Sequence, residues 1–308
     1  IAAALLLSAP GAFAAETAQP QNKAADSAQK GVALPAIRVT GQMDNATTEG
    51  TGSYTTGETA AATRLPMTLK ETPQAVTVIT RQRMDDQQLN TVQSVLENTN
   101  GVTARQADSE RTSFYSRGLL INNVQYDGIP TVIGNAVNGS GISALDTAFY
   151  DRVEVVRGGS ALLTGTGNPS ASINLVRKRP TPEFAASASL GAGSWDTHRG
   201  MGDVSTPLTE DGRIRARLVG TYQDGNSYLD GYKPERKAFY GIVEADLTAD
   251  TTVSLGYDYQ DITPKGATWG GLPLWYSDGS QIDYSRSKSY GQDWSHFDNT
   301  LKTAFAEV

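Results

Sequence analysis

A glycine-rich stretch between two apolar runs is the first part of this sequence that could do chemistry. Residues 152–180 read RVEVVRGGSALLTGTGNPSASINLVRKRP, and a loop of this kind can cradle a phosphate with its backbone amides. A Walker-type loop also requires a lysine and a serine or threonine after its last glycine. Here Asn168 and Pro169 follow Gly167, and proline has no amide to donate. The stretch is therefore interpreted as a turn between two strands.

Residues for acid–base, nucleophilic or metal chemistry are sparse. The chain has two histidines, His198 and His296, both in predicted loops, and it has no cysteine. No G-x-S-x-G motif occurs, and the acidic residues do not cluster with the spacing of metal ligands. We therefore expect no enzyme, no resident metal and no other cofactor.

Aromatic side chains offer binding chemistry instead. The segment TPKGATWGGLPLWYSDG places Trp269, Trp275 and Tyr276 in one predicted loop. Flat, large side chains suit a bulky and partly apolar ligand, and a guanidinium group suits a ligand of negative charge. The alternative is that the tryptophans anchor the protein at a lipid interface.

Composition limits the class of protein that could position these residues. The chain has 308 residues, a net charge of −7, 31 glycines and 13 tyrosines, which suits a β protein with many turns. An acidic chain without a basic stripe does not neutralise phosphates, so we expect no nucleic-acid partner.

The N-terminal residues predict export. Residues 1–14 are an apolar run that ends in Ala12-Phe13-Ala14, the small-residue pattern of a signal-peptide cleavage site, so cleavage is expected before Ala15. The run is shorter than the roughly 20 residues that span a bilayer as a helix. Residues 15–63 are polar and poor in large apolar side chains, and we expect them to be flexible.

One short segment within this polar tract has a strand-like pattern. In residues 35–41, Ile37 and Val39 alternate with Arg38 and Thr40. An isolated strand of this kind can be captured by another protein as an added β-strand. Without further context, a chance β-prone heptad is an equally good interpretation.

Residues 64–182 have the pattern of a small α+β domain. We expect one helix of about a dozen residues within residues 82–101, followed by a strand. In SFYSRGLLINNVQYDGIP we expect two strands around Asn122-Asn123, and in residues 145–180 a short helix, a strand, a turn and a second strand.

Residues 183–308 alternate apolar and polar residues over segments of about ten. In RIRARLVGTYQ, apolar residues such as Leu218 alternate with Arg213, Arg215 and Arg217, which cannot face a dry core unpaired. The segments AFYGIVEADL and TTVSLGYDYQD repeat the pattern, and we count six strands. Tight turns alternate with long loops at residues 225–236 and 262–296, which is typical of an outer-membrane barrel. A soluble β-sandwich with one wet face is the alternative.

Three motifs occur in order: ETPQAVTVIT, YSRGLLINNVQYDGIP and YDRVEVVRGGSALLTGTGNPSASINLVRKRP. Together they resemble the plug domain of TonB-dependent outer-membrane receptors of the ferric-siderophore class, and the resemblance runs from about Ile37 to the end of the chain. Gly159, Thr164 and Ser170-Ala171 depart from the usual residues at turn positions. The implied fold is a membrane β-barrel with an N-terminal α+β plug domain, here residues 64–182, followed by about the first six of 22 strands.

The resemblance also implies partners and a location. Residues 35–41 would be the TonB box, with Ile37, Arg38, Val39 and Thr40 captured by TonB and its inner-membrane energising complex. The cargo would be a ferric siderophore, which we expect to be of hydroxamate type, with iron only as cargo. We expect a monomer in the lipid of the Gram-negative outer membrane; haem, cobalamin or a passive porin are the alternatives. The short stretch before the box leads us to expect transport without transcriptional signalling.

Site residues follow from the same resemblance. Arg117 corresponds to a plug arginine that contacts siderophore in pyoverdine and coprogen-type receptors, although it could instead hold a plug turn. Five further residues are candidates for siderophore contact: Tyr115, Tyr126, Trp269, Trp275 and Tyr276. We expect a third group, Arg152, Glu154 and Arg157, to pair with charges on the barrel wall.

Overall fold

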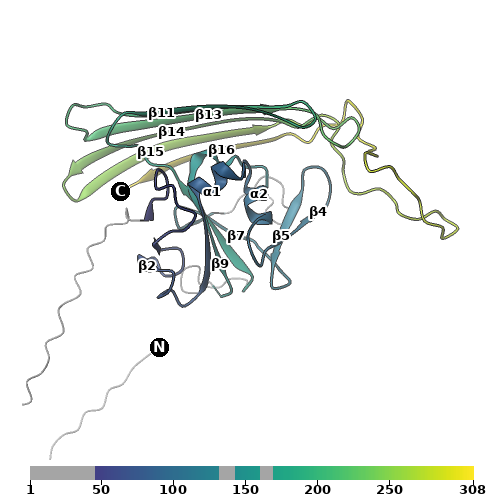
Figure 1. The fold of residues 1–308 in the computed structure, drawn as a ribbon, viewed down its shortest axis with the longest axis horizontal. Coiled ribbons are helices and arrows are strands. Elements are labelled where there is room, and N and C mark those ends of the chain that lie inside the picture. Colours follow the sequence, from purple (N-terminus) through teal and green to yellow (C-terminus); the bar gives the residue numbers. More distant parts are fainter. Residues whose placement is uncertain (1–45, 132–142, 160–168) are drawn as a thin grey trace, which may run out of the picture. The chain divides into compact units, whose positions relative to one another are not determined.

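The computed structural model describes residues 46–131, 143–159 and 169–308 (Figure 1). The chain divides into two compact units, residues 1–41 and 42–308. The first unit lies outside the described residues, and so do the predicted signal peptide and the predicted TonB box.

The first described part, which we call the plug domain, holds three small sheets and two helices. It begins at residue 46, so the expectation of a flexible segment up to residue 63 was wrong for residues 46–63, where Thr48 and Glu49 bind Asp151 and β1 pairs with β2. Its five-stranded sheet has the order β3-β9-β10-β7-β8, with β9 antiparallel to β10 and β10 parallel to β7. The strands of this sheet are β3 Ala75–Thr80, β7 Asn123–Tyr126, β8 Ile129–Thr131, β9 Tyr150–Arg157 and β10 Ala171–Arg177. The other strands are β1 Glu58–Thr59, β2 Met67–Thr68, β4 Thr103–Gln106, β5 Thr112–Ser116 and β6 Leu119–Leu120. The glycine-rich stretch therefore connects two antiparallel strands, as predicted.

The expected single helix was wrong, because the chain forms two short helices, α1 Arg81–Asp86 and α2 Val92–Glu97. Gln88 has a φ of 49°, and Leu89 donates its amide to the carbonyl of Met84, which closes α1 in a Schellman-type end. Thr91 then starts α2 with a capping box. The local capping residues overrode a continuous helical pattern.

The two strands expected around Asn122-Asn123 are four short strands, β5 to β8. Two residue-glycine turns interrupt the apolar runs: Arg117-Gly118 between β5 and β6, and Asp127-Gly128 between β7 and β8. Both residues of each turn have positive φ, between 49° and 81°. Glycine adopts such a conformation without the steric cost that a Cβ atom brings, so these dipeptides reverse the chain within two residues.

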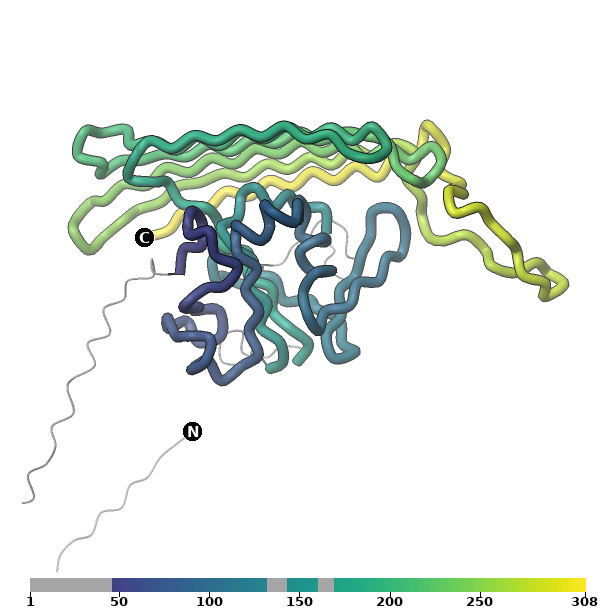
Figure 2. The backbone as a smooth tube through the Cα atoms, viewed as in Figure 1, coloured from purple at the N-terminus to yellow at the C-terminus, as the bar shows by residue number. Residues whose placement is uncertain are grey.

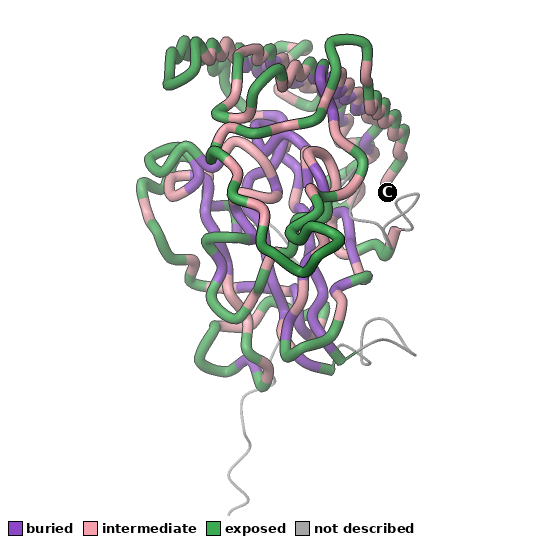
Figure 3. Tube along the Cα trace, turned by 90° about the vertical axis from the view of Figure 1, so that its right-hand side faces the viewer, coloured by how far each residue is buried: buried purple, intermediate pink, exposed green. Residues whose placement is uncertain are grey.

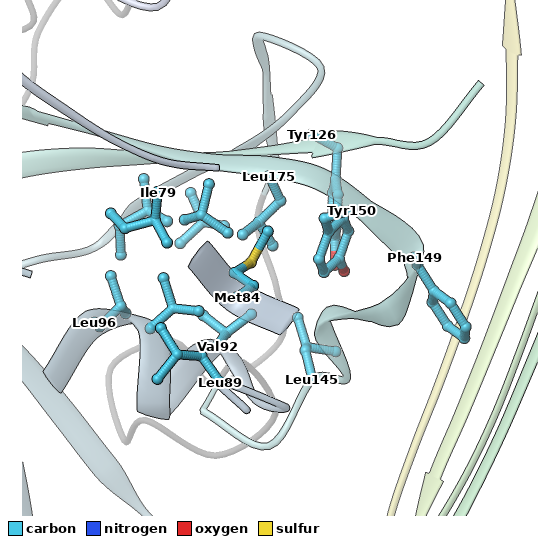
Figure 4. Close-up of a cluster of buried hydrophobic side chains, with 14 of the residues drawn as sticks. Ile79, Met84, Leu89, Val92, Leu96, Tyr126, Leu145, Phe149, Tyr150 and Leu175 are labelled. Atoms are coloured by element: carbon cyan, nitrogen blue, oxygen red, sulfur yellow. The ribbon is translucent and has the colours of Figure 1, made fainter. Parts of the chain in front are cut away.

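Apolar side chains from the helices and the five-stranded sheet fill the core of the plug domain (Figure 4). Ile79, Met84, Leu96 and Leu145 are fully buried. Leu145 precedes the short 3-10 helix η3 Thr147–Phe149. Figure 3 shows the buried strands running through the middle of this domain. The helices thus cover one face of the sheet with a compact apolar layer.

The second described part is a six-stranded antiparallel sheet with its strands in chain order, which we call the wall sheet. The strands are β11 Ala185–Gly193, β12 Thr197–Pro207, β13 Ile214–Asp224, β14 Glu235–Thr248, β15 Thr251–Ile262 and β16 Asn299–Glu307. The predicted count of six is confirmed. Residues 208–213 and 249–250 are tight turns at one end, whereas residues 225–234 and 263–298 are loops at the other, the long-loop end (Figure 2).

The alternation predicted for the wall sheet is confirmed on its outer face. Leu218, Val243 and Leu255 are between 43% and 60% exposed, whereas Arg217 and Glu244 are buried. The inner face also carries an apolar patch, because Tyr240 and Ile242 point inward and are at most 2% exposed. Phe149 of the plug domain stacks on Tyr240 with ring centroids 5.5 Å apart. The pattern of polar side chains on the inner face is thus interrupted where the plug domain contacts the wall sheet.

Candidate functional site

Arg117 occupies the first position of the two-residue turn between β5 and β6. Its φ is 55° and that of Gly118 is 78°, as a type I′ turn requires. The residue is exposed, and its guanidinium group lies against Gly158, where an added Cβ atom would be 3.0 Å from Nη1 of Arg117. Arg117 therefore lies on the surface of the plug domain, beside the start of the glycine-rich turn.

The two tyrosines expected beside Arg117 have different surroundings. Tyr115 is half-buried in β5, two residues before the arginine. Tyr126 is only 4% exposed: its ring lies 6.3 Å from that of Tyr150 and 4.7 Å from the guanidinium carbon of Arg177. The expectation that Tyr126 contacts a ligand was wrong, because its ring fills the plug core. Tyr115 stays a prediction.

The structure separates the three aromatic residues of the long loop. Trp269 lies against the plug domain, with its ring centroid 3.9 Å from the guanidinium carbon of Arg111. Trp275 and Tyr276 are 61% and 58% exposed near the loop tip, where Trp275 is bridged to Gln281. Only Trp269 thus has a contact in the described structure that ties it to the plug domain.

Arg111 belongs to a group of residues that we call the clasp. Its plug side is the tetrapeptide Asp108, Ser109, Glu110 and Arg111, and its loop side is Tyr232, Thr268, Trp269 and Gly270. The sequence did not predict this group. The segment ADSER reads as an ordinary polar turn between two strands, and nothing in it indicates a partner.

The expectation that Arg152 and Glu154 pair with the barrel wall was wrong. Arg152 binds Asp151 and Glu154 at 2.8 and 2.9 Å, and Glu154 also accepts a hydrogen bond of 2.7 Å from Asn174. All these residues belong to the plug domain. Both side chains are buried, with Glu154 1% and Arg152 9% exposed, and their partners are plug residues. Arg152 and Glu154 therefore stabilise the plug domain internally.

Arg157 was expected in the same group but faces a different neighbour. It is half-buried at the end of β9, and its position puts it on the opposite face from Arg152 and Glu154. Its guanidinium group lies against Gly101, which has a φ of 77° and leaves no room for a side chain there. Glycine at this position thus makes space for the arginine within the plug domain.

The charges that do join the plug domain to the wall sheet lie near the tight-turn end. Lys178, which directly follows β10, binds Asp203 of β12 at 2.9 Å. Arg217 of β13 binds the same carboxylate at 2.7 Å and Glu49 at 2.6 Å. Arg179 extends the network to Glu244 and Glu307. Lys178 and Arg179 stand in the RKRP ending of the third plug motif, for which the sequence predicted no role, whereas Arg217 is one of the inward-facing arginines of β13.

Glu49 is the acidic residue of the plug domain in this network. Burial by itself raises its pKa, but the hydrogen bonds from Arg217 and the positive charges of Lys178 and Arg217 outweigh burial and lower the pKa. The carboxylate is therefore ionised at neutral pH, and its pairing with Arg217 holds the start of the plug domain on the wall sheet.

A second junction lies nearer the long-loop end. Both oxygens of Asp146 accept hydrogen bonds from Arg199 of β12, at 2.7 and 2.8 Å. Thr221 donates a third at 3.0 Å, and the amide of Asp146 donates to Gln260 of β15 at 2.7 Å. With the clasp, contacts between the two parts occur at three levels along the strands. Each level joins different plug residues to the wall.

The described residues offer no site for a metal ion of three or more His, Cys, Asp or Glu ligands. Within the same residues, no helix is long and apolar enough to cross a bilayer.

Comparisons with known proteins agree with this architecture. Residues 68–172 match the family model described as TonB-dependent Receptor Plug Domain. The chain is 47% identical over 285 residues to the ferripyoverdine receptor of Pseudomonas aeruginosa, covering 92% of this chain and 35% of the relative. It thus spans about a third of that relative's length.

Solved structures show the same likeness in three dimensions. The ferripyoverdine receptor of the Pseudomonas aeruginosa outer membrane, bound to ferripyoverdine, matches with a TM-score of 0.82 and 49% identity over 85% of this chain and 35% of that chain. The alcaligin outer-membrane receptor of Bordetella pertussis matches with a TM-score of 0.64 and 44% identity over 70% of this chain and 39% of that chain.

Proposed function

Because the chain belongs to the TonB-dependent receptors of the Gram-negative outer membrane, we propose that the complete protein imports a ferric siderophore. The observation that carries this proposal is the 47% identity to a ferripyoverdine receptor, across both the plug domain and the wall strands. A pyoverdine is therefore the first cargo to test. A hydroxamate chelate remains the proposal made from the sequence, and iron enters only as cargo.

The geometry supports a ligand site between the plug surface and the long loops. Arg117 offers an exposed guanidinium group on the plug domain, and Trp269 offers an aromatic surface that is 67% exposed. An anionic or partly apolar chelate can use both kinds of contact. In this proposal the long-loop end faces outward and the tight turns face the periplasm.

The driving force would come from TonB. An outer membrane has no nucleotide supply, so the energy must arrive through a partner that the inner membrane energises. We propose residues 35–41 as the TonB box, which would be captured as an added strand and pull on the plug domain. The other proposed properties are a monomeric state, contact with outer-membrane lipid and no nucleic-acid partner.

The test is uptake and binding of a panel of chelates by the complete receptor in cells that lack other receptors. The panel contains ferripyoverdine, a hydroxamate such as ferrioxamine, haem and cobalamin. TonB-dependent accumulation of ferripyoverdine or the hydroxamate would support the proposal and identify the cargo. Accumulation of haem or cobalamin alone would overturn it.

Two substitutions test the site itself. Arg117→Ala should weaken binding of the imported chelate by about tenfold to 150-fold, because a charged hydrogen bond contributes about 1.5–3 kcal/mol. Tyr126→Phe should leave affinity unchanged, since the ring is buried in the plug core. An Arg117→Ala receptor that binds as the parent does would assign the arginine to the turn alone.

A further inference from the structure

The centre of the clasp is the carboxylate of Asp108, whose side chain is fully buried. It accepts backbone hydrogen bonds from Glu110 and Arg111 at 3.1 and 2.9 Å, and one from Gly270 of the long loop at 3.3 Å. It also accepts a bond of 2.6 Å from Nε of Arg111. One carboxylate therefore orders the plug tetrapeptide, fixes the guanidinium group and ties both to the loop.

Arg111 carries this order to Trp269. Because Asp108 holds the guanidinium group at Nε and Nη2, its flat face is presented to the indole ring at 3.9 Å. Such a cation–π contact becomes stronger as it is removed from water. Phe297 stacks on the indole as well, with centroids 5.3 Å apart. The indole of Trp269 therefore contacts one plug residue and one residue of its own loop, while 67% of the tryptophan's surface stays exposed.

Two further contacts hold the loops on the same tetrapeptide. Ser109 and Thr268 are joined by two hydrogen bonds. The amide of Ser109 donates to the hydroxyl of Thr268 at 3.3 Å, and the amide of Thr268 donates to the hydroxyl of Ser109 at 3.0 Å. The hydroxyl of Tyr232 donates to Glu110 at 2.7 Å. Tyr232 lies in residues 225–234 and Thr268 in residues 263–298, so both long loops are joined to four consecutive plug residues.

We propose that the clasp positions Trp269 for the ligand, with Asp108 and Arg111 as positioning residues that act through the tryptophan. The indole would contact the chelate, and its place would be set by the plug domain rather than by the loop alone. A displacement of residues 108–111 would then withdraw an aromatic contact from the ligand. This inference rests on the proposed function.

A double-mutant cycle on the complete receptor tests it, with the affinity for ferripyoverdine as the readout. Trp269→Ala and Arg111→Ala should each weaken binding about fivefold to tenfold, as the loss of an aromatic contact of about 1–1.4 kcal/mol predicts. The double variant should bind no more weakly than Trp269→Ala alone, because Arg111 acts through the indole. Arg111→Lys should be about as weak as Arg111→Ala, since lysine lacks the planar face and Nε.

Arg105→Ala is the matched control, because Arg105 is an exposed arginine on β4 of the same domain. It should bind as the parent does, and all variants should reach the outer membrane in equal amounts. Effects of Arg111→Ala and Trp269→Ala that simply add would overturn the positioning role, and so would parent affinity in either variant. A parent receptor that does not bind ferripyoverdine but imports haem would instead overturn the proposed function.

Discussion

Glu49 and Arg217 form a two-point ion pair: Nη1 and Nη2 of the arginine each lie 2.6 Å from a different oxygen of the glutamate. Glu49 stands eight residues after Gly41, the last residue of the predicted TonB box, whereas Arg217 lies on β13 of the wall sheet. The amides of Thr48 and Glu49 also donate to Asp151 of β9, at 3.0 and 2.7 Å. A pull on the box would reach these contacts before it reaches the five-stranded sheet.

Glu49→Gln should release the start of the plug domain without unfolding it. The substitution removes one charge from the ion pair, yet Arg217 keeps Asp203 as a partner, so we expect a local cost of about 1–2 kcal/mol. Hydrogen exchange at the amides of Thr48 and Glu49 should become about tenfold faster, while amides of β9 should keep their protection.

Glu97→Gln is the control for that experiment, because it makes the same change at an exposed helical glutamate. It should leave the exchange rates of residues 48 and 49 as they are in the parent. Unchanged exchange in Glu49→Gln would show that Asp151 alone holds the segment.

The ion pair should also respond to acid. Since the folded-state pKa of Glu49 is lowered, its stabilising contribution is fully present above about pH 4.5 and is lost as the pH falls through the lowered value. After correction for intrinsic rates, protection of the Thr48 and Glu49 amides should be constant from pH 7 to about 5 and should fall as the pH drops through the lowered pKa. The Glu49→Gln receptor should lack this contribution, and an equal fall in that variant would assign the acid response to another carboxylate.

The wall sheet could be predicted from the sequence because its signal is local. Alternation with period two needs only one strand at a time, so the outward position of Leu218 and Val243 could be inferred without knowing their neighbours. The apolar inward residue Tyr240 breaks the pattern because Phe149 covers it, and that residue lies far away in the chain.

The contacts that join the two parts could not be predicted, because each depends on distant partners. Arg152 and Glu154 lie in one strand and satisfy each other, whereas Lys178 finds Asp203 in another strand. All four are charged residues in or beside β-strands, and sequence spacing does not distinguish them. The clasp tetrapeptide is likewise an ordinary polar turn until the loop residue Thr268 is placed beside it.

Val39→Pro should abolish uptake while leaving ligand binding intact. Proline removes one amide donor from the predicted box, so a strand that pairs with TonB would lose a hydrogen bond and its regular geometry. Uptake and surface binding of the same labelled chelate are measured side by side. Val32→Pro, the same change outside the box in the same polar tract, should transport normally. Equal loss of binding and uptake in Val39→Pro would contradict the assignment of residues 35–41.

A disulfide across the clasp should separate binding from transport. The exchanged hydrogen bonds bring the side chains of Ser109 and Thr268 together, and the chain has no cysteine of its own, so Ser109→Cys with Thr268→Cys creates a single possible pair within it. The oxidised receptor should bind its chelate as the parent does, because the clasp is already closed in this structure. It should not import the chelate if residues 108–111 must leave the loop when TonB pulls on the plug domain, and a reductant should restore uptake.

Each single cysteine variant should transport in both redox states. Full uptake by the oxidised double variant would show that the clasp moves with the loops and stays closed throughout transport.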